Sequence, residues 1–328
     1  MKFGIISFAH MHAHAYAAAI NQLPGLELVG IADEDKARGG EVARQYETRH
    51  MKDYRDLLAE DIDAVVICSP NAHHREHAVA AAEAKKHILC EKPMATSIDD
   101  ARAMIDAAEK AGVVLQTAFP VRHANPVREL KRAITSGALG EIIGINASNH
   151  GTMPPGWFLD KDLAGGGAVM DHTVHVADIV RWMLGAEFTN VYAEYDTLLH
   201  EVDVDDCGML TMELSTGAIV SLDTSWSRPA NFPIWGDVTM EVVGDKGSAS
   251  LDTFSQVGTV YRATTEPGQG SVRYNGWANN ADLEMVKAFI AAIEGKPNDG
   301  ASGWDGRKAM EVALGAYQSG RRGAPVSL

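Results

Sequence analysis

Hydrophobic residues in the first third of the chain form short, almost uninterrupted runs. Runs of this length and continuity predict strands that are buried on both faces. Stretches over residues 35–46, 73–84 and 98–111 separate the runs and are long enough to be crossover helices. The alternation predicts a doubly wound, parallel α/β sheet. The runs are FGIISF from Phe3, LELVGIA from Leu26, AVVICS from Ala64, HILC from His87 and VVLQTAF from Val113.

After Phe119 the hydrophobic pattern changes to longer segments in which apolar and polar residues alternate, at 141–149, 188–199, 207–214 and 218–226. Short polar connections that contain glycine join them, as between antiparallel neighbours. This pattern predicts an α+β domain with a mostly antiparallel open sheet, closed by helices near 281–294 and 304–319. We therefore expect a Rossmann-type dinucleotide-binding domain over residues 1–120 and a substrate-binding and oligomerisation domain over 121–328.

Composition and charge narrow the classes of partner. The 328 residues carry a formal net charge of −15, which would repel a nucleic-acid backbone and an anionic membrane surface. Three cysteines without a CxxC pair favour a reducing compartment. The N-terminus lacks the pattern of a signal peptide, and no apolar run is long enough for a membrane span. The sequence therefore predicts a soluble, cytoplasmic protein.

The first turn after a strand, residues 7–12, is where a glycine fingerprint would let the backbone approach a pyrophosphate. Ser7, Ala9 and His12 replace the three glycines. Asp33 ends the second strand, where a carboxylate binds the adenosine ribose and favours NAD, although Arg38 could accommodate NADP. The alternative is that Asp33 only caps the next helix.

Two further turns carry candidate chemistry. The segment from Ser69 to His74 follows the run AVVICS, and Glu91, Lys92 and Pro93 follow the run HILC, so both lie at the edge of the sheet where ligands bind. A lysine fixed beside a nicotinamide ring can donate a hydrogen bond to a reacting oxygen. A lysine at a strand end can also be merely solvated.

Three glycines, at residues 165–167, precede a predicted helix on which Asp171 and His175 are four residues apart and share one face. A carboxylate beside an imidazole is suited to moving one proton. The alternative is a solvated helical pair. Although thirteen histidines are present, the Asp171 segment is not HExxH and no zinc-like spacing occurs, so we expect no metal.

These motifs resemble those of the glucose-fructose oxidoreductase and inositol dehydrogenase family, also written Gfo/Idh/MocA. The resemblance covers essentially the whole chain and rests on Glu91-Lys92-Pro93, the segment from Pro70 to His74, Arg122 and the triple glycine. It implies an NAD(P)-dependent oxidoreductase acting on a sugar, inositol or polyol, with Glu91, Lys92 and Arg122 around the nicotinamide. Lys92, Asp171 and His175 match the family's catalytic positions.

The hypothesis is that His175 accepts the hydroxyl proton, Lys92 stabilises the alkoxide, and Asp171 polarises His175 or binds an adjacent hydroxyl. The predicted cofactor-binding residues are Ser7, Phe8, Ala9, His10, Met11, Asp33, Arg38, Ser69, Asn71, His74, Glu91, Lys92 and Arg122. The predicted substrate-binding residues are Lys92, His150, Trp157, Asp171, His172 and His175.

Two alternatives remain at this point. One is a catalytically silent dinucleotide or sugar sensor, favoured by the missing glycines. The other is a redox-neutral lyase or glycosidase that recycles its NAD with the same residues. The apolar face of the second sheet also suggests a homodimer or homotetramer.

Overall fold

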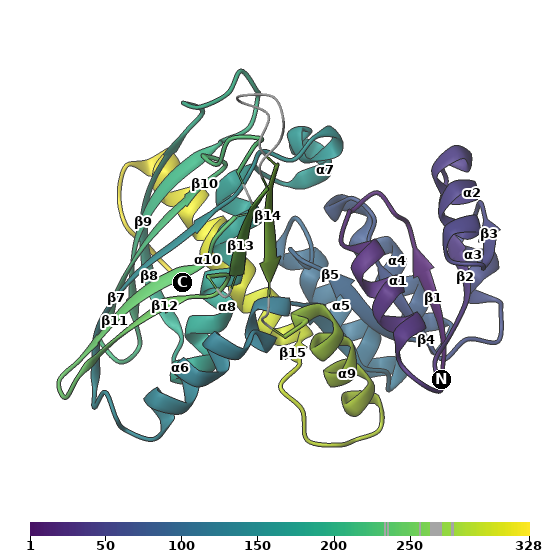
Figure 1. The fold of residues 1–328 in the computed structure, drawn as a ribbon, viewed down its shortest axis with the longest axis horizontal. Coiled ribbons are helices and arrows are strands. Elements are labelled where there is room, and N and C mark those ends of the chain that lie inside the picture. The colour runs from purple at the N-terminus through teal and green to yellow at the C-terminus, as the bar shows by residue number, and fades with distance from the viewer. Residues whose placement is uncertain (233, 235, 256, 263–270, 277–278) are drawn as a thin grey trace.

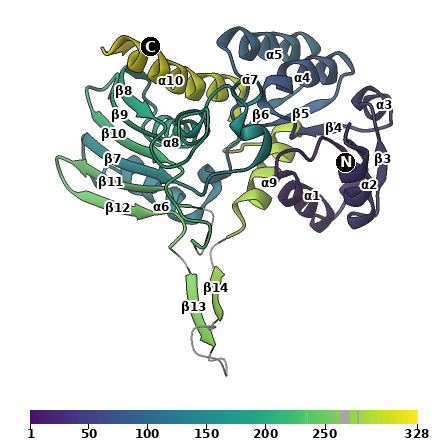
Figure 2. The ribbon, with the colours of Figure 1, turned by 90° about the horizontal axis from the view of Figure 1, so that it is seen from above.

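The structure is a computed structural model that describes residues 1–232, 234, 236–255, 257–262, 271–276 and 279–328. Two seven-stranded sheets lie side by side, and a two-stranded hairpin extends away from them (Figures 1 and 2). The hairpin consists of β13 (Val257–Arg262) and β14 (Ser271–Gly276).

The first sheet is parallel and has the order β15-β6-β5-β4-β1-β2-β3. Only β15 (Ala301–Ser302) runs antiparallel, beside β6. The order reverses beside β1, so the crevice between the carboxyl ends of β1 and β4 is the expected ligand site. The predicted doubly wound sheet is confirmed. Its parallel strands are β1 (Lys2–Ile6), β2 (Glu27–Ala32), β3 (Arg49–Met51), β4 (Ala64–Ile67), β5 (His87–Glu91) and β6 (Leu115–Ala118).

Helices cover both faces of this sheet, which is why its strands are apolar almost throughout. Ser97 caps α5 by accepting the Asp100 N–H, and Gly112 ends that helix in a left-handed conformation with φ of 70°. The helices are α1 (Ala13–Gln22), α2 (Lys36–Gln45), α3 (Tyr54–Leu58), α4 (His74–Glu83) and α5 (Ile98–Ala111), with short 3₁₀ turns η1 (Asn71–His73) and η2 (Pro120–His123).

The second sheet has the order β12-β11-β7-β10-β9-β8-β16, and all pairs except β7–β10 are antiparallel. Buried and exposed residues alternate along β9, as the sequence predicted for a sheet covered on one face. The strands are β7 (Ile142–His150), β8 (Phe188–Asp196), β9 (Cys207–Leu214), β10 (Ile219–Ser225), β11 (Thr239–Gly244), β12 (Ser248–Asp252) and β16 (Val326–Ser327).

Helices α8 (Ala168–Leu184) and α10 (Gly303–Arg322) cover the inner face of the second sheet (Figure 2). The remaining elements of this half are α6 (Asn125–Thr135), η3 (Gly156–Leu159) and α7 (Lys161–Ala164). Both predicted closing helices are present, and the first of them, α9 (Ala281–Ile293), packs against α1 and η2. The chain therefore returns to the first sheet after the second sheet is complete.

One hydrophobic core joins the two halves. Buried residues of α5 and of the turn after β5, including Met94 and Met104, belong to the same cluster as Val169 of α8 and Met310 of α10. This packing holds α8 opposite the carboxyl ends of β1 and β5. None of the described helices is both long and apolar enough to cross a membrane.

Candidate active site

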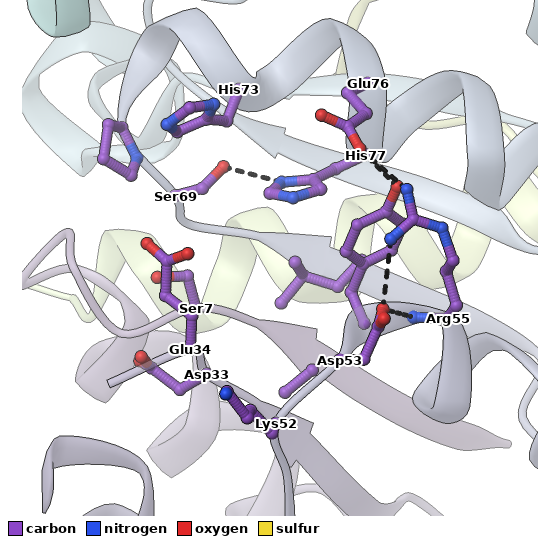
Figure 3. A pocket seen from close by; sticks show the side chains of 14 residues that line it. Ser7, Asp33, Glu34, Lys52, Asp53, Arg55, Ser69, His73, Glu76 and His77 are labelled. Carbon is purple, nitrogen blue, oxygen red and sulfur yellow. Dashed lines mark hydrogen bonds and ion pairs between the residues drawn. The ribbon is translucent and has the colours of Figure 1, made fainter. Parts of the chain in front are cut away.

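Two cavities lie at the carboxyl edge of the first sheet, on either side of the first βα turn. The strand-end cavity has a volume of about 460 Å³, and Ser7 and Asp33 lie in its lining (Figure 3). The interdomain cavity has a volume of about 280 Å³ and is lined by the other end of the same turn, by Lys92 and by α8. A dinucleotide that crosses this turn would reach both cavities.

The first turn forms without glycine because neighbouring groups hold it. Ser7 adopts a left-handed conformation with φ of 68°, and its hydroxyl oxygen accepts the Ala9 N–H at 3.1 Å. The Phe8 N–H donates to Asp33 at 2.8 Å. From the second half of the chain, the Trp157 indole N–H donates to the Ala9 carbonyl at 3.0 Å. The left-handed position that a glycine fingerprint supplies is therefore present.

Asp33 lies at the predicted place, but its carboxylate is already engaged. It accepts the Phe8 and Asp35 N–H groups, and Arg38 binds it through two nitrogens at 2.7 and 2.8 Å. Arg38 therefore neutralises Asp33 and does not itself line either cavity. Glu34, Asp53 and Glu76 leave the strand-end cavity rich in carboxylates (Figure 3).

The segment after β4 contributes one residue to the cavity lining and others that hold the surrounding loops in place. Ser69 lines the strand-end cavity, and its hydroxyl lies 2.9 Å from Nδ1 of His77 (Figure 3). His74 is fully buried, and its two ring nitrogens lie within hydrogen-bond distance of the carbonyls of Ser69 and Pro93. Asn71 donates to the Ala164 carbonyl across the two halves. His74 and Asn71 thus hold loops in place.

Lys92 and Asp171 meet in the interdomain cavity. The Lys92 ammonium lies 2.5 Å from Oδ1 of Asp171, and both side chains are buried. The other carboxylate oxygen, Oδ2, accepts the Trp226 indole N–H at 3.2 Å. Burial alone would raise the pKa of the Asp171 carboxyl, but Lys92 and His172 outweigh it and hold that pKa well below its usual range. Asp171 is therefore a carboxylate that orients Lys92.

His175 enters the same cavity from one turn further along α8. Burial, reinforced by the charge of Lys92, holds its pKa well below the usual value, so the imidazole is neutral near pH 7. Within the described residues its Nδ1 has no hydrogen-bond partner. The predicted bond from Asp171 to His175 is not formed, because the carboxylate points to Lys92 and Trp226 instead.

The three glycines bring α8 close to its neighbours. A Cβ atom at Gly166 would collide with the Tyr317 hydroxyl, and one at Gly167 with the Asp205 carbonyl. The Asp205 carboxylate accepts the Gly167 and Val169 N–H groups at 2.9 and 2.8 Å. These bonds satisfy the free N–H groups at the start of α8 and fix the position of Asp171.

Three buried polar atoms in the lining of the interdomain cavity have no hydrogen-bond or ion-pair partner among the described residues. Because buried polar groups are almost always hydrogen-bonded, such a group of orphans indicates a polar ligand. Nδ1 of His10 accepts the His12 N–H, so its Nε2 carries a proton and offers a donor. The atoms are Nε2 of His10, Oδ1 of Asn149 and Nδ1 of His175, whereas Nε2 of His172 lies 3.3 Å from the Asp171 carboxylate.

Three predicted site residues lie outside both cavities for identifiable reasons. His150 lies between Asp223 and Asp237, whose hydrogen bonds raise its pKa to about 9, and its neighbour Asn149 faces the cavity instead. Trp157 stacks on Phe158, which lines the cavity in its place. The Arg122 guanidinium binds the buried Asp178 carboxylate through two nitrogens.

The predicted residues therefore divide into two groups. Those that line a cavity are Ser7, His10, Met11, Asp33, Ser69, Lys92, Asp171, His172 and His175. Those that line neither are Phe8, Ala9, Arg38, Asn71, His74, Glu91, Arg122, His150 and Trp157. Glu91 is completely buried behind Lys92, where it accepts the Tyr16 hydroxyl at 2.6 Å.

A group of metal-ligand type lies beside the first turn. Single ligand atoms of His10, His12 and Glu91 all lie within 4.8 Å of one another. Glu91 is already bound by Tyr16 and by the Lys92 N–H, and His10 accepts the His12 N–H. The predicted independence from metal stays a prediction.

Several lining residues were missed, namely His12, Asn149, Phe158, Asp237 and Asp282. Asn149 and Phe158 are adjacent in sequence to two predicted residues, His150 and Trp157. The sequence therefore indicated the correct segments but not which of their side chains face the cavity. Asp282 had no motif around it. The one available signal was its place in the first turn of a predicted helix.

Comparisons with known proteins agree with this geometry. Residues 1–119 match a family model described as "Oxidoreductase family, NAD-binding Rossmann fold". Residues 127–250 match the model of the "GFO/IDH/MocA C-terminal domain".

Named relatives match over nearly their whole length. The chain is 30% identical to the D-glucoside 3-dehydrogenase of Escherichia coli (strain K12), covering 100% of this chain and 97% of the relative. It is 29% identical to the myo-inositol 2-dehydrogenase of Thermotoga maritima, covering 97% and 96%. Among solved structures, GenD2 from gentamicin A biosynthesis in complex with NAD matches with a TM-score of 0.92 and 26% identity, covering 100% of this chain and 96% of that one.

Proposed function

Because the chain belongs to the GFO/IDH/MocA family of oxidoreductases, we propose that it transfers a hydride between NAD and a hydroxyl-bearing carbon of a sugar, inositol or related polyol. The relatives named above are dehydrogenases of a glucoside and of myo-inositol. A polyhydroxylated ligand also matches the cavity, whose orphan polar atoms include both a donor and an acceptor.

The observation that carries the proposal is that Lys92, Asp171 and His175, from the two halves of the chain, line one interdomain cavity. An alcohol oxidation requires a hydride acceptor, a group that stabilises the alkoxide and a base for the hydroxyl proton. Lys92 and His175 supply the last two. A pure sensor would have no need of a buried ammonium and a neutral imidazole in the same cavity.

The chain offers a fitting site for NAD. The strand-end cavity follows β1, β2 and β4, and Ser7 holds the left-handed turn that passes beneath a pyrophosphate. Within the described residues, the Met11 N–H at the start of α1 has no partner and could bind a phosphate oxygen. Asp33 and Asp53 are paired with Arg38 and Arg55, but Glu34 lines the same cavity without an ion pair to the described residues. Its charge disfavours an added 2′-phosphate, so NAD is the expected cofactor and NADP the poorer one.

When bound, NAD supplies the hydride acceptor; the residues of the chain position the substrate and move its proton. Asp171 holds the Lys92 ammonium in place, and the ammonium stabilises negative charge on the reacting oxygen. Neutral His175 accepts the hydroxyl proton at an unoccupied nitrogen. Asn149 and His10 bind neighbouring hydroxyl groups, one as acceptor and the other as donor.

We further propose that the protein pairs through the open face of the second sheet. Met209, Ile219 and Val243 are each at least half exposed on this sheet. Antiparallel faces of this kind can self-associate around a twofold axis. Light scattering on the purified protein would give a dimer or tetramer mass, whereas a monomer would contradict the proposal.

We expect the protein to work in the cytoplasm. Its three cysteines, Cys68, Cys90 and Cys207, are all free thiols, and two of them are buried. Free thiols are typical of reducing compartments. Fractionation of the native cells would test this.

The experiment that tests the function is a screen of sugars and polyols with NAD and NADP, followed by the absorbance of the reduced nicotinamide. We expect steady NADH formation with at least one neutral polyol. A sensor would form no NADH, and a redox-neutral lyase would convert sugar without net NADH at steady state. Either result would contradict the proposal.

A further inference from the structure

One carboxylate in the interdomain cavity is not neutralised by the described residues. Asp282, in the first turn of α9, lines the cavity, and no hydrogen bond or ion pair within the described part of the chain reaches its side chain. The other two lining carboxylates are paired. Asp171 binds Lys92, and Asp237 binds Arg228 and His150.

Asp282 lies on the first-sheet side of the cavity. Its helix packs against α1 and η2. Burial raises the pKa of its carboxyl above the usual value. Among charged groups, His12 at the end of the first turn lowers this pKa and Glu91 at the end of β5 raises it. Asp171 and Asp237 approach from the second half of the chain. Asp282 therefore lies in the part of the cavity nearest the first turn and the end of β5, where a nicotinamide that reaches Lys92 would lie.

The positive groups nearby do not cancel this charge. Lys92 is bound by Asp171, and the ring of His12 lies 3.4 Å from the buried Glu91 carboxylate. Each of these positive groups thus has its own negative partner. The carboxylate of Asp282 leaves an excess of negative charge beside the cavity.

The nicotinamide ring carries one positive charge in NAD⁺ and none in NADH, because the hydride brings two electrons and one proton to the ring. A nearby carboxylate attracts the charged ring and does not attract the neutral one. We propose that Asp282 is a specificity-determining residue for the oxidation state of the cofactor. It makes the site bind NAD⁺ in preference to NADH and so lowers the reduction potential of the bound cofactor. This inference rests on the proposed function, because it requires the nicotinamide to enter the interdomain cavity.

A simpler role for Asp282 is to stabilise α9 through the helix dipole, because acidic residues are favourable in the first turn of a helix. Glu284 lies in the same first turn and is paired with Lys287. It does not line the cavity. Glu284→Gln therefore removes one charge from the same helix end and serves as the matched control.

The test is the dissociation constant of NAD⁺ and of NADH for the wild type, Asp282→Asn, Asp282→Glu and Glu284→Gln, measured by calorimetry without any sugar. We expect Asp282→Asn to weaken NAD⁺ binding about tenfold and to change NADH binding less than about twofold. A tenfold rise in the dissociation constant of NAD⁺ relative to that of NADH corresponds to a rise of about 30 mV in the reduction potential of the bound cofactor. Asp282→Glu and Glu284→Gln should keep the wild-type ratio.

Two results would overturn the inference. One is an Asp282→Asn variant that weakens both forms equally or neither. The other is a Glu284→Gln variant that changes the ratio as much. These outcomes leave the proposed function intact, whereas a wild type that binds neither form would contradict that function and the inference together. Asp282→Glu separates the loss of charge from a local structural change, because it keeps the carboxylate.

Discussion

The turn before α1 lines the interdomain cavity and the turn before α8 positions a helix that lines it, but the two turns meet opposite requirements. The turn before α1 contains no glycine, although a dinucleotide fingerprint would place three there. The turn before α8 contains three in succession, at residues 165–167. The difference follows from what surrounds each backbone. Around the first turn, neighbours donate and accept hydrogen bonds, whereas around the second, they occupy the space of a side chain.

In the first turn the strained position is held by side chains. The Ser7 hydroxyl, the Asp33 carboxylate and the Trp157 indole each bind a backbone group of residues 8 or 9. In the second turn the Asp205 carbonyl and the Tyr317 ring lie where Cβ atoms would be. A nucleotide-binding turn can therefore form without the fingerprint glycines. Where neighbouring atoms occupy the space of a Cβ atom, only glycine fits.

The largest expected effect is that of Gly167→Ala in the second turn. Its Cβ would collide with the Asp205 carbonyl, so the start of α8 would shift together with Asp171 and His175. We expect a loss of about 3 kcal/mol or more in the free energy of unfolding and at least a 100-fold loss of kcat/KM, roughly. Urea unfolding and steady-state kinetics would measure both. Ala9→Gly in the first turn is the matched control and should change kcat/KM less than about threefold.

A smaller effect is expected for Trp226→Phe, which keeps a buried ring but removes the N–H that holds Asp171. Hydrogen bonds to charged groups contribute roughly 1.5–3 kcal/mol, so kcat should fall about 10- to 100-fold. The affinity for NAD should stay within about twofold, because the indole does not line the strand-end cavity. An unchanged kcat would show that the second turn positions Asp171 without Trp226.

The stability of the first turn should depend on the Ser7 hydroxyl group rather than on an added glycine. Ser7→Ala keeps the left-handed residue but removes the acceptor for the Ala9 N–H, so stability should fall by about 1 kcal/mol. Ser7→Gly relieves the strain and should be more stable than Ser7→Ala. Thermal unfolding of the two variants beside the wild type would decide. A Ser7→Gly variant less stable than Ser7→Ala would contradict the explanation given for this turn.

The smallest effect concerns pH. Burial lowers the pKa of His12, but Glu91 outweighs it and leaves that pKa raised above its usual value. A raised pKa means that the stability contributed by the protonated ring is present below the usual histidine pKa and is lost as pH rises through the folded-state pKa. The urea midpoint of the wild type should therefore decline slightly more than that of His12→Asn between about pH 6 and pH 9. Equal declines of the two urea midpoints would show that protonated His12 does not stabilise the first turn.

The fold followed from the sequence because its signals are local and repeated. Buried runs such as AVVICS and the alternation along 207–214 specify strands whatever their partners are. The return of the chain to the first sheet through α9 and β15 had no such signal, since two residues of strand carry no pattern.

The sequence predicted site residues where they belong to a recognisable motif. It did not predict the direction of side chains whose orientation depends on tertiary packing. Lys92, Asp171 and His175 meet as expected. Asp171 turns to Lys92 because a buried ammonium needs a counter-charge more than a neutral imidazole does. Arg122 meets Asp178 rather than the cavity for the same reason, and Asp178 is far from it in sequence.

We propose that Lys92 and His175 act together on one hydroxyl group of the substrate, and a double-mutant cycle tests this most directly. The measurement is kcat/KM for Lys92→Met, His175→Ala and the double variant, with NAD affinity checked for each. Because groups that act as a unit are not additive, the double variant should be no more than about tenfold worse than the worse single variant. Losses that multiply as if independent, or a single variant with near wild-type activity, would contradict the account.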